Sequence, residues 1–232
     1  MKYSGRARRA AFKLIGLSLI VALAAWGGVG LLTAIGNFLM ASRAAILAAV
    51  IVAWALFAAF TLYFFRDPDP RVPSGTGLVV SPAHAKVDVI DAATEAEFMG
   101  GPCQRISMFL SVIDVHVQHA PVSGTVALVK HSPGRFVNAL RTDSAACNEN
   151  VLVGFAASEP AREKLAVRLV AGAIARRIVP FVKTGDVVAR GDRISLIQFG
   201  SRADVYLPLH AKIKVQLGEH VMGGETVLAA FD

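Results

Sequence analysis

A glycine followed by a serine, Gly200-Ser201, stands between two β-type runs, 193–199 and 203–207. A serine hydroxyl can attack the carbonyl of the preceding residue if the peptide is held distorted and the oxyanion is stabilised. Glycine before the serine removes the Cβ that would obstruct this approach. The ester formed can eliminate the upstream chain, and hydrolysis of the remaining dehydroalanine releases ammonia and leaves a pyruvoyl group. That carbonyl can form a Schiff base with an amine and act as an electron sink, although the local sequence alone favours an ordinary turn between strands.

Two histidines are candidates for proton transfer. His116 lies in Asp114-Val115-His116-Val117, which predicts a strand with His116 on the face opposite its valine neighbours. A lone histidine in a strand is more often structural, but an imidazole with a pKa near neutrality also suits a proton donor. His119, three residues further on, would point toward the other face of a regular strand. The remaining histidines lack the paired spacing of a metal site, so we predict no metal.

The elements that must hold these residues begin after a basic, apolar N-terminal region, 1–65. It contains two uncharged segments, 14–35 and 44–65, each about long enough to cross a bilayer as a helix. The short linker between them predicts a two-helix membrane hairpin, and the positive-inside rule puts both of its ends in the cytoplasm. A cleaved signal peptide and a hairpin that dips into one leaflet are the alternatives.

The charge is divided unevenly between this region and the remainder of the chain. Of the 24 lysines and arginines, six lie in residues 1–65, where there is no acidic residue, and the other 18 face 17 acidic residues. Nucleic acid is therefore excluded as a partner, because no basic stripe remains beyond the hairpin, and an anionic membrane surface is favoured. Cys103 and Cys147 are isolated, and we expect both to be reduced in a cytoplasmic domain.

Residues 66–232 are predicted to form a mainly β soluble domain, a β-sandwich or barrel-like fold. Short β-type runs separated by Gly, Pro and Asp begin after 64–73, with a short helix expected at 92–99. An internal repeat, V-x-x-G-[D/E]-x-V-x-x-G-[D/E]-x-[I/V], relates 182–194 to 215–227 and predicts glycines with positive φ in two successive turns. It resembles the β-sandwich of biotinyl and lipoyl carrier domains, but the chain has no lysine at the position that carriers modify.

Five blocks in one order resemble the short bacterial and archaeal phosphatidylserine decarboxylase proenzymes. They accompany the cleavage-site stretch 197–208 and include the entry to the soluble domain, a histidine motif and a segment ahead of the cleavage site. The blocks are Phe64–Pro68, Phe109–Gly124, Pro133–Ala139, Asn148–Asn150 and Ile174–Val179.

This resemblance implies self-cleavage between Gly200 and Ser201, conversion of Ser201 to a covalent pyruvoyl cofactor, and decarboxylation of phosphatidylserine to phosphatidylethanolamine. His116 matches the proton donor of the family, and His119 matches a histidine that assists self-cleavage in longer relatives. Arg176 and Arg177 could hold a lipid phosphate, and a solvated strand end is the alternative. We expect a membrane-bound heterodimer of the two fragments at the cytoplasmic face of the cell membrane, with a higher oligomer as the alternative.

One position departs from the family. Ser81-Pro82-Ala83-His84-Ala85-Lys86-Val87 carries His84 where the family usually has the aspartate that orients the histidine of self-cleavage. A histidine accepts a proton but does not supply the fixed negative charge that stabilises an imidazolium. Either His84 acts as the base, or cleavage is slow, or the chain is a non-processing, membrane-anchored paralogue with a binding or scaffold role. A decarboxylase acting on another amino acid or amino-lipid is a further alternative.

Overall fold

The computed structural model describes residues 5–32, 40–135, 147–159, 163–172, 177–198 and 201–231. Gly200 and Arg176, two of the predicted site residues, lie outside these ranges. The described chain divides into two compact units, one of residues Gly5–Arg66 and the other running from Asp67 onward.

The first unit is a pair of apolar helices, α1 (Arg6–Leu32) and α2 (Met40–Phe64). Their stretches Arg6–Gly27 and Arg43–Phe64 have mean hydropathies of 1.9 and 2.5 and are long enough to cross a membrane. Helix α1 begins eight residues before the apolar segment at 14–35, because the Ala, Arg and Lys that precede this segment are good helix formers. Trp54 Nε1 of α2 donates a hydrogen bond to Ser18 Oγ of α1 at 2.9 Å.

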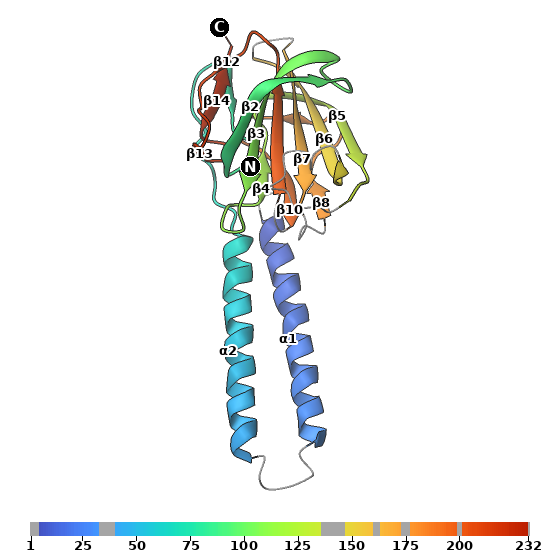
Figure 1. Cartoon of the computed structure of the whole chain (residues 1–232), viewed down its shortest axis with the longest axis vertical. Coiled ribbons are helices and arrows are strands. Elements are labelled where there is room, and N and C mark those ends of the chain that lie inside the picture. The colour runs from blue at the N-terminus through green and yellow to red at the C-terminus, as the bar shows by residue number, and fades with distance from the viewer. Residues whose placement is uncertain are drawn as a thin grey trace. The chain divides into compact units, whose positions relative to one another are not determined.

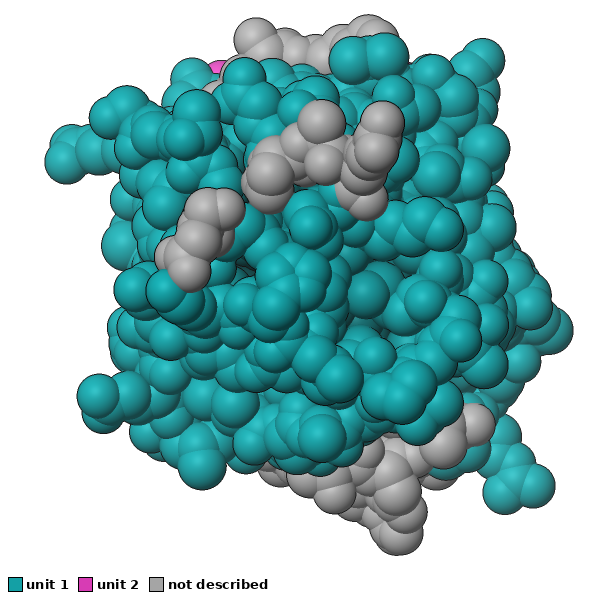
Figure 2. Space-filling model, turned by 90° about the horizontal axis from the view of Figure 1, so that it is seen from above, with its two compact units in different colours: residues 1–4, 67–232 teal, residues 5–66 magenta. Residues whose placement is uncertain are grey.

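The second unit is built of strands, as Figure 1 shows, so the predicted mainly β fold preceded by two apolar helices is confirmed. Figure 2 shows the surface of this unit in teal. The strands are β1 (Leu78–Val80), β2 (Ala85–Glu95), β3 (Gly101–Leu110), β4 (Val117–His119), β5 (Gly124–Ser132), β6 (Asn150–Ala157), β7 (Lys164–Ala171), β8 (Arg177–Pro180), β9 (Val187–Val188), β10 (Arg193–Gln198), β11 (Ser201–Leu207), β12 (Lys212–Ile213), β13 (His220–Val221) and β14 (Val227–Ala230).

The largest sheet has eight strands in the order β13-β2-β3-β11-β7-β6-β5-β9, and two three-stranded sheets have the orders β4-β10-β8 and β1-β14-β12. Neighbouring strands pair antiparallel. All seven residues of β11 are buried, since the strand lies between β3 and β7. Ala203, Val205 and Leu207 join the apolar core, whereas Arg202, Asp204 and Tyr206 alternate with them and face the other side of the sheet.

The internal repeat is present in the backbone. Gly185 and Gly191 of the first copy have φ values of 94° and 82°, and Gly218 and Gly224 of the second have 86° and 76°. The predicted positive φ at all four positions is confirmed, and it explains the choice of glycine, because L-residues rarely adopt this region. The likeness to carrier domains stays a prediction.

Two local predictions are wrong. Residues 92–99 do not form a helix: β2 continues to Glu95, whose carboxylate accepts hydrogen bonds from the backbone N–H groups of residues 97, 98 and 99 and so closes a tight turn. His116 does not lie within a strand, because β3 ends at Leu110, a turn follows, and β4 begins at Val117.

Candidate active site

Ser201 is the first residue of β11, opposite Leu110 of β3 and Ala171 of β7. Its side chain is fully buried, and within the described part of the chain Oγ has no hydrogen-bond partner. The preceding strand, β10, ends at Gln198 in a different sheet. The chain therefore changes sheets across the predicted cleavage bond, and the serine hydroxyl is not engaged by the described residues around it.

His116 is buried and its ring is oriented by the backbone. Nδ1 lies 2.9 Å from the carbonyl oxygen of Asp114, so the proton of the neutral ring belongs on Nδ1, and Nε2 is the nitrogen that can exchange a proton. The carbonyl of His116 accepts hydrogen bonds from Ile197 N at 3.1 Å and from Gln118 Nε2 at 2.7 Å. Ser195 Oγ in turn donates to Gln118 Oε1 at 2.6 Å, and this fixes the amide.

The same contacts bring His116 toward Ser201. His116 follows Leu110 by six residues, and Leu110 lies opposite Ser201. Ile197, whose N–H donates a hydrogen bond to the carbonyl of His116, precedes Ser201 by only four residues. Four residues of chain span at most about 14 Å. The structure thus gathers the predicted nucleophile and the predicted proton donor into one region.

His84 and His119 form a second pair. A Cβ added to Gly223 would lie 3.1 Å from Nδ1 of each ring, so the two nitrogens are within about 6 Å of one another. Gly223 N donates to His84 Nδ1 at 3.1 Å, which leaves the proton of a neutral His84 on Nε2. Neither ring nitrogen of His119 has a hydrogen-bond partner among the residues that the structure describes.

Burial lowers the pKa of His119 to about 3, and the charges of His84 and Arg193 add to this effect, while Asp69 opposes it. His119 is therefore neutral near pH 7. Arg193 lies opposite His119 in the β10–β4 pair, with a side chain only 1% exposed. Its guanidinium binds Asp67 Oδ1 at 2.7 Å and Asp69 Oδ1 at 2.8 Å, so it fastens the first residues of the second unit beside the histidines.

The histidine pair lies at the same end of the sheet as Ser201. Lys86 is opposite Phe109, which is opposite Arg202, so the chain around His84 lies two strand spacings, about 10 Å, from the chain around Ser201. Asp88 does not substitute for the missing aspartate. A bulge in β2 between Val87 and Val89 interrupts the register at Asp88, which binds the Arg202 guanidinium through both oxygens at 2.8 and 2.5 Å.

The predicted phosphate ligands are only partly described. Arg177 is exposed at the start of β8, opposite Gln198, and so lies close to the point where the chain leaves β10. Within the described residues, no group of three histidine, cysteine or acidic side chains could hold a metal ion. Sequence reasoning missed the residues that support the site, Gln118, Ser195 and Arg193, because no local pattern marks the partner of a buried polar side chain.

Comparison with known proteins then decides the family. Residues 57–229 match the family model described as phosphatidylserine decarboxylase. The chain belongs to the phosphatidylserine decarboxylase family. A phosphatidylserine decarboxylase proenzyme from Desulfotalea psychrophila is 42% identical over 173 residues, 75% of this chain and 80% of the relative. A proenzyme of the same name from Symbiobacterium thermophilum is 38% identical over 215 residues, 90% of this chain and 94% of the relative.

The family predicted from the sequence is therefore confirmed, and with it the class of enzyme, a decarboxylase. All three histidines and Ser201 fall within the matched residues. Their individual roles stay predictions.

Proposed function

We propose that this chain is a self-cleaving, pyruvoyl-dependent decarboxylase that converts phosphatidylserine to phosphatidylethanolamine. The observation that carries the proposal is Ser201, a buried serine at the start of a central strand whose Oγ has no hydrogen-bond partner in the described residues. A buried hydroxyl is normally bonded, so an unengaged one marks a functional position. The family match supplies the reaction class.

Self-cleavage would proceed by attack of Ser201 Oγ on the carbonyl of Gly200, with the serine proton passing to a nearby base. His119 is neutral and can accept a proton, although its lowered pKa makes it a weak base. His84 does not stand in for an aspartate through Nδ1, since that atom already accepts the Gly223 N–H. We therefore expect self-cleavage to be slow.

A pyruvoyl group on residue 201 would supply the electron sink for loss of the carboxylate. Its position fits this role, because β11 is held between β3 and β7 and presents its first residue in a buried region. His116, protonated on both ring nitrogens, would give its Nε2 proton to the carbon that loses CO2, with Asp114 O holding Nδ1–H during the transfer and the neutral ring left behind. Arg177 would contact the lipid phosphate.

The two fragments, 1–200 and 201–232, would remain associated as a heterodimer. After cleavage β11 still pairs with β3 and β7, β13 with β2, and β14 with β1, so three strands of the small fragment stay in sheets of the large one. We propose residues 1–65 as the membrane hairpin and 66–232 as the decarboxylase domain at the cytoplasmic face. This placement suits a lipid substrate, which need not leave the membrane.

The deciding experiment combines intact mass with release of labelled CO2 from carboxyl-labelled phosphatidylserine, using the full chain in detergent. We expect two fragments divided between residues 200 and 201, with a blocked small fragment, and CO2 release that Ser201→Ala abolishes. Ser107→Ala, at a buried serine whose hydroxyl has a hydrogen-bond partner away from the histidines, is the matched control and should still cleave. A wild-type chain that stays intact would instead favour the non-processing paralogue, and release from other amino acids would change the substrate.

A further inference from the structure

The turn from Ser111 to Asp114 displays two apolar side chains beside the candidate active site. Val112 is 44% exposed and Ile113 is 61% exposed. The corners of β-turns usually carry Pro, Gly, Asn, Asp or Ser, so two β-branched aliphatic residues are an unusual choice there. The turn follows directly after Leu110, the partner of Ser201, and leads to His116.

Hydrogen bonds hold this turn in one shape. Asp114 N donates to Ser111 O at 3.0 Å, and Asp114 Oδ2 accepts from Ser111 N and Ser111 Oγ at 2.8 Å each. Asp114 Oδ1 lies 2.8 Å from His220 Nε2 of β13. The exposure of Val112 and Ile113 is therefore imposed by the fold, which holds the two side chains outward where an apolar partner can reach them.

Basic side chains stand near the turn on the neighbouring strands. Lys86 is exposed on β2, opposite Phe109 of β3 on one side and His220 of β13 on the other. Arg177 is exposed at the start of β8, opposite Gln198, whose neighbour Ile197 donates to the carbonyl of His116 just after the turn. The nearby acids are engaged: Asp88 binds Arg202, Asp114 closes the turn, and the Glu219 carboxylate accepts Gln216 N. An apolar tip flanked by cations complements an anionic lipid surface.

The unit that contains the turn also follows the two membrane-length helices directly in the chain. Helix α2 ends at Phe64, and the second unit, which contains the turn, begins at Asp67. An amphipathic protein surface joined so directly to two membrane-length helices meets lipid more readily than it meets a soluble partner.

We propose that the Ser111–Asp114 turn is a lipid-contact turn, which inserts Val112 and Ile113 into the headgroup layer of a phosphatidylserine-containing bilayer. Lys86 and Arg177 meet the anionic headgroups around it. The turn thereby keeps Ser201 and His116, which lie next to it in the fold, near the plane of the lipid. The identity of the lipid as substrate rests on the proposed function, whereas the contact itself does not.

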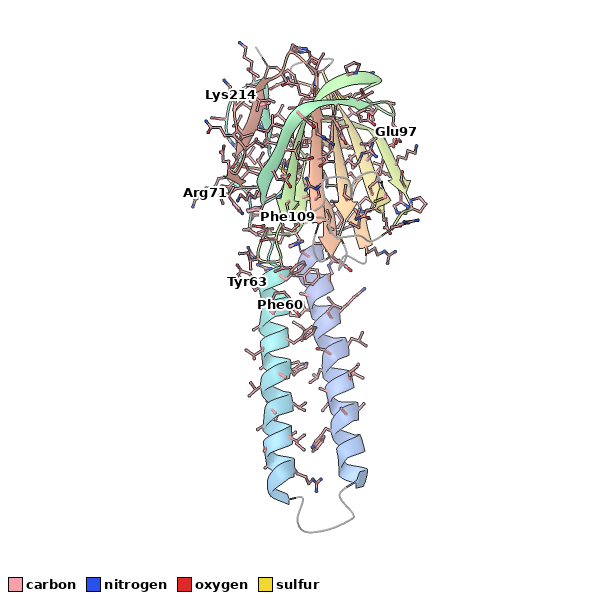
Figure 3. All side chains as sticks on the ribbon, in the orientation of Figure 1. Phe60, Tyr63, Arg71, Glu97, Phe109 and Lys214 are labelled. Carbon is pink, nitrogen blue, oxygen red and sulfur yellow. The ribbon has the colours of Figure 1, made fainter. Side chains whose placement is uncertain are left out.

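The test uses the full chain in vesicles of phosphatidylcholine with or without phosphatidylserine, each containing spin-labelled quencher lipid. A fluorophore is attached to Ile113→Cys in a Cys147→Ser background, since Cys147 is exposed and Cys103 is buried. The matched control is Leu209→Cys, because Leu209 is also 61% exposed but lies beyond the other end of β11. Figure 3 labels Phe109 and Lys214, neighbours of the two positions, at opposite ends of the unit.

We expect several-fold stronger quenching at position 113 than at 209, and more with phosphatidylserine than without it. Equal quenching at the two positions would overturn the proposal. Quenching at 113 that does not respond to phosphatidylserine would overturn the role of the cations.

A kinetic measurement tests the consequence for catalysis. Val112→Ser with Ile113→Ser should raise KM for phosphatidylserine in vesicles several-fold, whereas Leu209→Ser should not, with self-cleavage followed by intact mass as the check on folding. An unchanged vesicle KM in the double variant would contradict a role in substrate delivery. If the wild type neither cleaves nor decarboxylates, the proposed function fails, but the quenching result still decides the lipid contact.

Discussion

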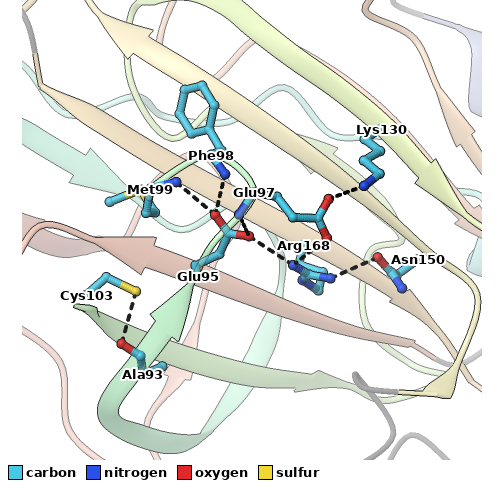
Figure 4. Close-up of polar contacts among 9 residues, drawn as sticks. All are labelled: Ala93, Glu95, Glu97, Phe98, Met99, Cys103, Lys130, Asn150 and Arg168. Atoms are coloured by element: carbon cyan, nitrogen blue, oxygen red, sulfur yellow. Dashed lines mark hydrogen bonds and ion pairs between the residues drawn. The ribbon is translucent and has the colours of Figure 1, made fainter. Parts of the chain in front are cut away.

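The buried polar side chains near Ser201 differ in their hydrogen bonding from those on the outer face of the large sheet. The outer face is the side to which Arg202, Asp204 and Tyr206 point, away from the apolar core. On the outer face, Glu95 accepts three backbone N–H groups and binds Arg168 at 3.2 Å, and Arg168 also donates to Asn150 (Figure 4). At the Ser201 end, Ser201 Oγ and both nitrogens of His119 have no hydrogen-bond partner in the described residues. Most of the outer groups are hydrogen-bonded, with Arg168 Nε and Asp204 Oδ2 as exceptions among the described residues, whereas the proposed function assigns the reaction to the groups at the Ser201 end.

This comparison predicts that substitutions at the site change the reaction more than the stability, and that substitutions on the outer face do the reverse. His116→Gln should show the largest effect of the first kind. We expect decarboxylation to fall by about 10²–10⁴-fold, the usual contribution of a positioned general acid. Self-cleavage should continue, and glutamine can still donate toward Asp114 O.

The measurement is CO2 release normalised to the cleaved fraction, and His131→Gln is the control, since His131 is exposed and lies beside Glu149. Equal loss in both variants, or loss of cleavage in His116→Gln, would contradict the assignment.

Glu95→Gln is the corresponding variant on the outer face and should mainly lower stability, by about 3 kcal/mol, because it breaks a buried, hydrogen-bonded ion pair. Burial opposes ionisation of Glu95, but the backbone N–H groups of residues 97–99 and the charge of Arg168 outweigh it and lower its pKa. The carboxylate thus adds stability that is complete above its ordinary pKa and lost as the pH falls through the lowered value.

Melting curves of wild type and Glu95→Gln should therefore differ most near pH 7 and converge as the pH falls below the ordinary glutamate pKa and through the lowered one. Glu97→Gln is the control, because Glu97 is more exposed and pairs with Lys130 at 2.7 Å and more distantly with Arg168 at 3.8 Å, near the surface, where an ion pair contributes about 1 kcal/mol or less. Equal destabilisation by the two variants would remove the distinction between the two regions.

The sequence allowed prediction of the parts of this arrangement that depend on local chemistry or on family motifs. The strands around Gly200-Ser201, the paired glycine turns and the apolar helices follow from periodicity and from the conformational freedom of glycine. The Arg202–Asp88 and Arg193–Asp67 ion pairs join residues 114 and 126 positions apart, and no pattern in one sequence relates them. The short helix expected at 92–99 was wrong because the Glu95 side chain closes a turn, a tertiary choice that helix propensity does not contain.

His84→Asp tests how the residue at position 84 affects the basicity of His119. A carboxylate near His119 would favour its protonated form and raise the pKa, which burial, His84 and Arg193 now lower to about 3. A stronger base should accelerate self-cleavage. Each unit by which the pKa rises corresponds to about a tenfold faster rate if the whole gain lowers the activation free energy. The measurement is the time course of fragment formation after pulsed cell-free synthesis, with His131→Asp as the control. A slower rate would show that His84 itself serves the cleavage, and an unchanged rate would show that the pKa of His119 does not limit it.

The smallest effect on stability is expected at Asp204, a buried carboxyl group on the outer face that is not fully hydrogen-bonded. Asp204 accepts a hydrogen bond from Ser107 Oγ through Oδ1, but Oδ2 is buried without a hydrogen-bond partner in the described chain. Burial raises the pKa of Asp204, although the Ser107 hydrogen bond and the guanidinium of Arg202 partly offset this. Its ionisation therefore removes stability as the pH rises from the ordinary aspartate pKa through the raised value.

Asp204→Asn keeps an acceptor for Ser107 and removes the buried charge, so we expect a stability change within about 1 kcal/mol of zero at neutral pH. Relative to wild type, the variant should gain stability as the pH rises above the ordinary aspartate pKa. The deficit of Glu95→Gln has the opposite sign: it grows as the pH rises toward the ordinary glutamate pKa and is constant above it. Melting temperatures of the three proteins, measured from below the ordinary carboxyl pKa values up to pH 8, test this directly. If both variants shifted in the same direction, burial of Asp204 would not oppose its charge, and the two carboxylates would belong to one stabilising network.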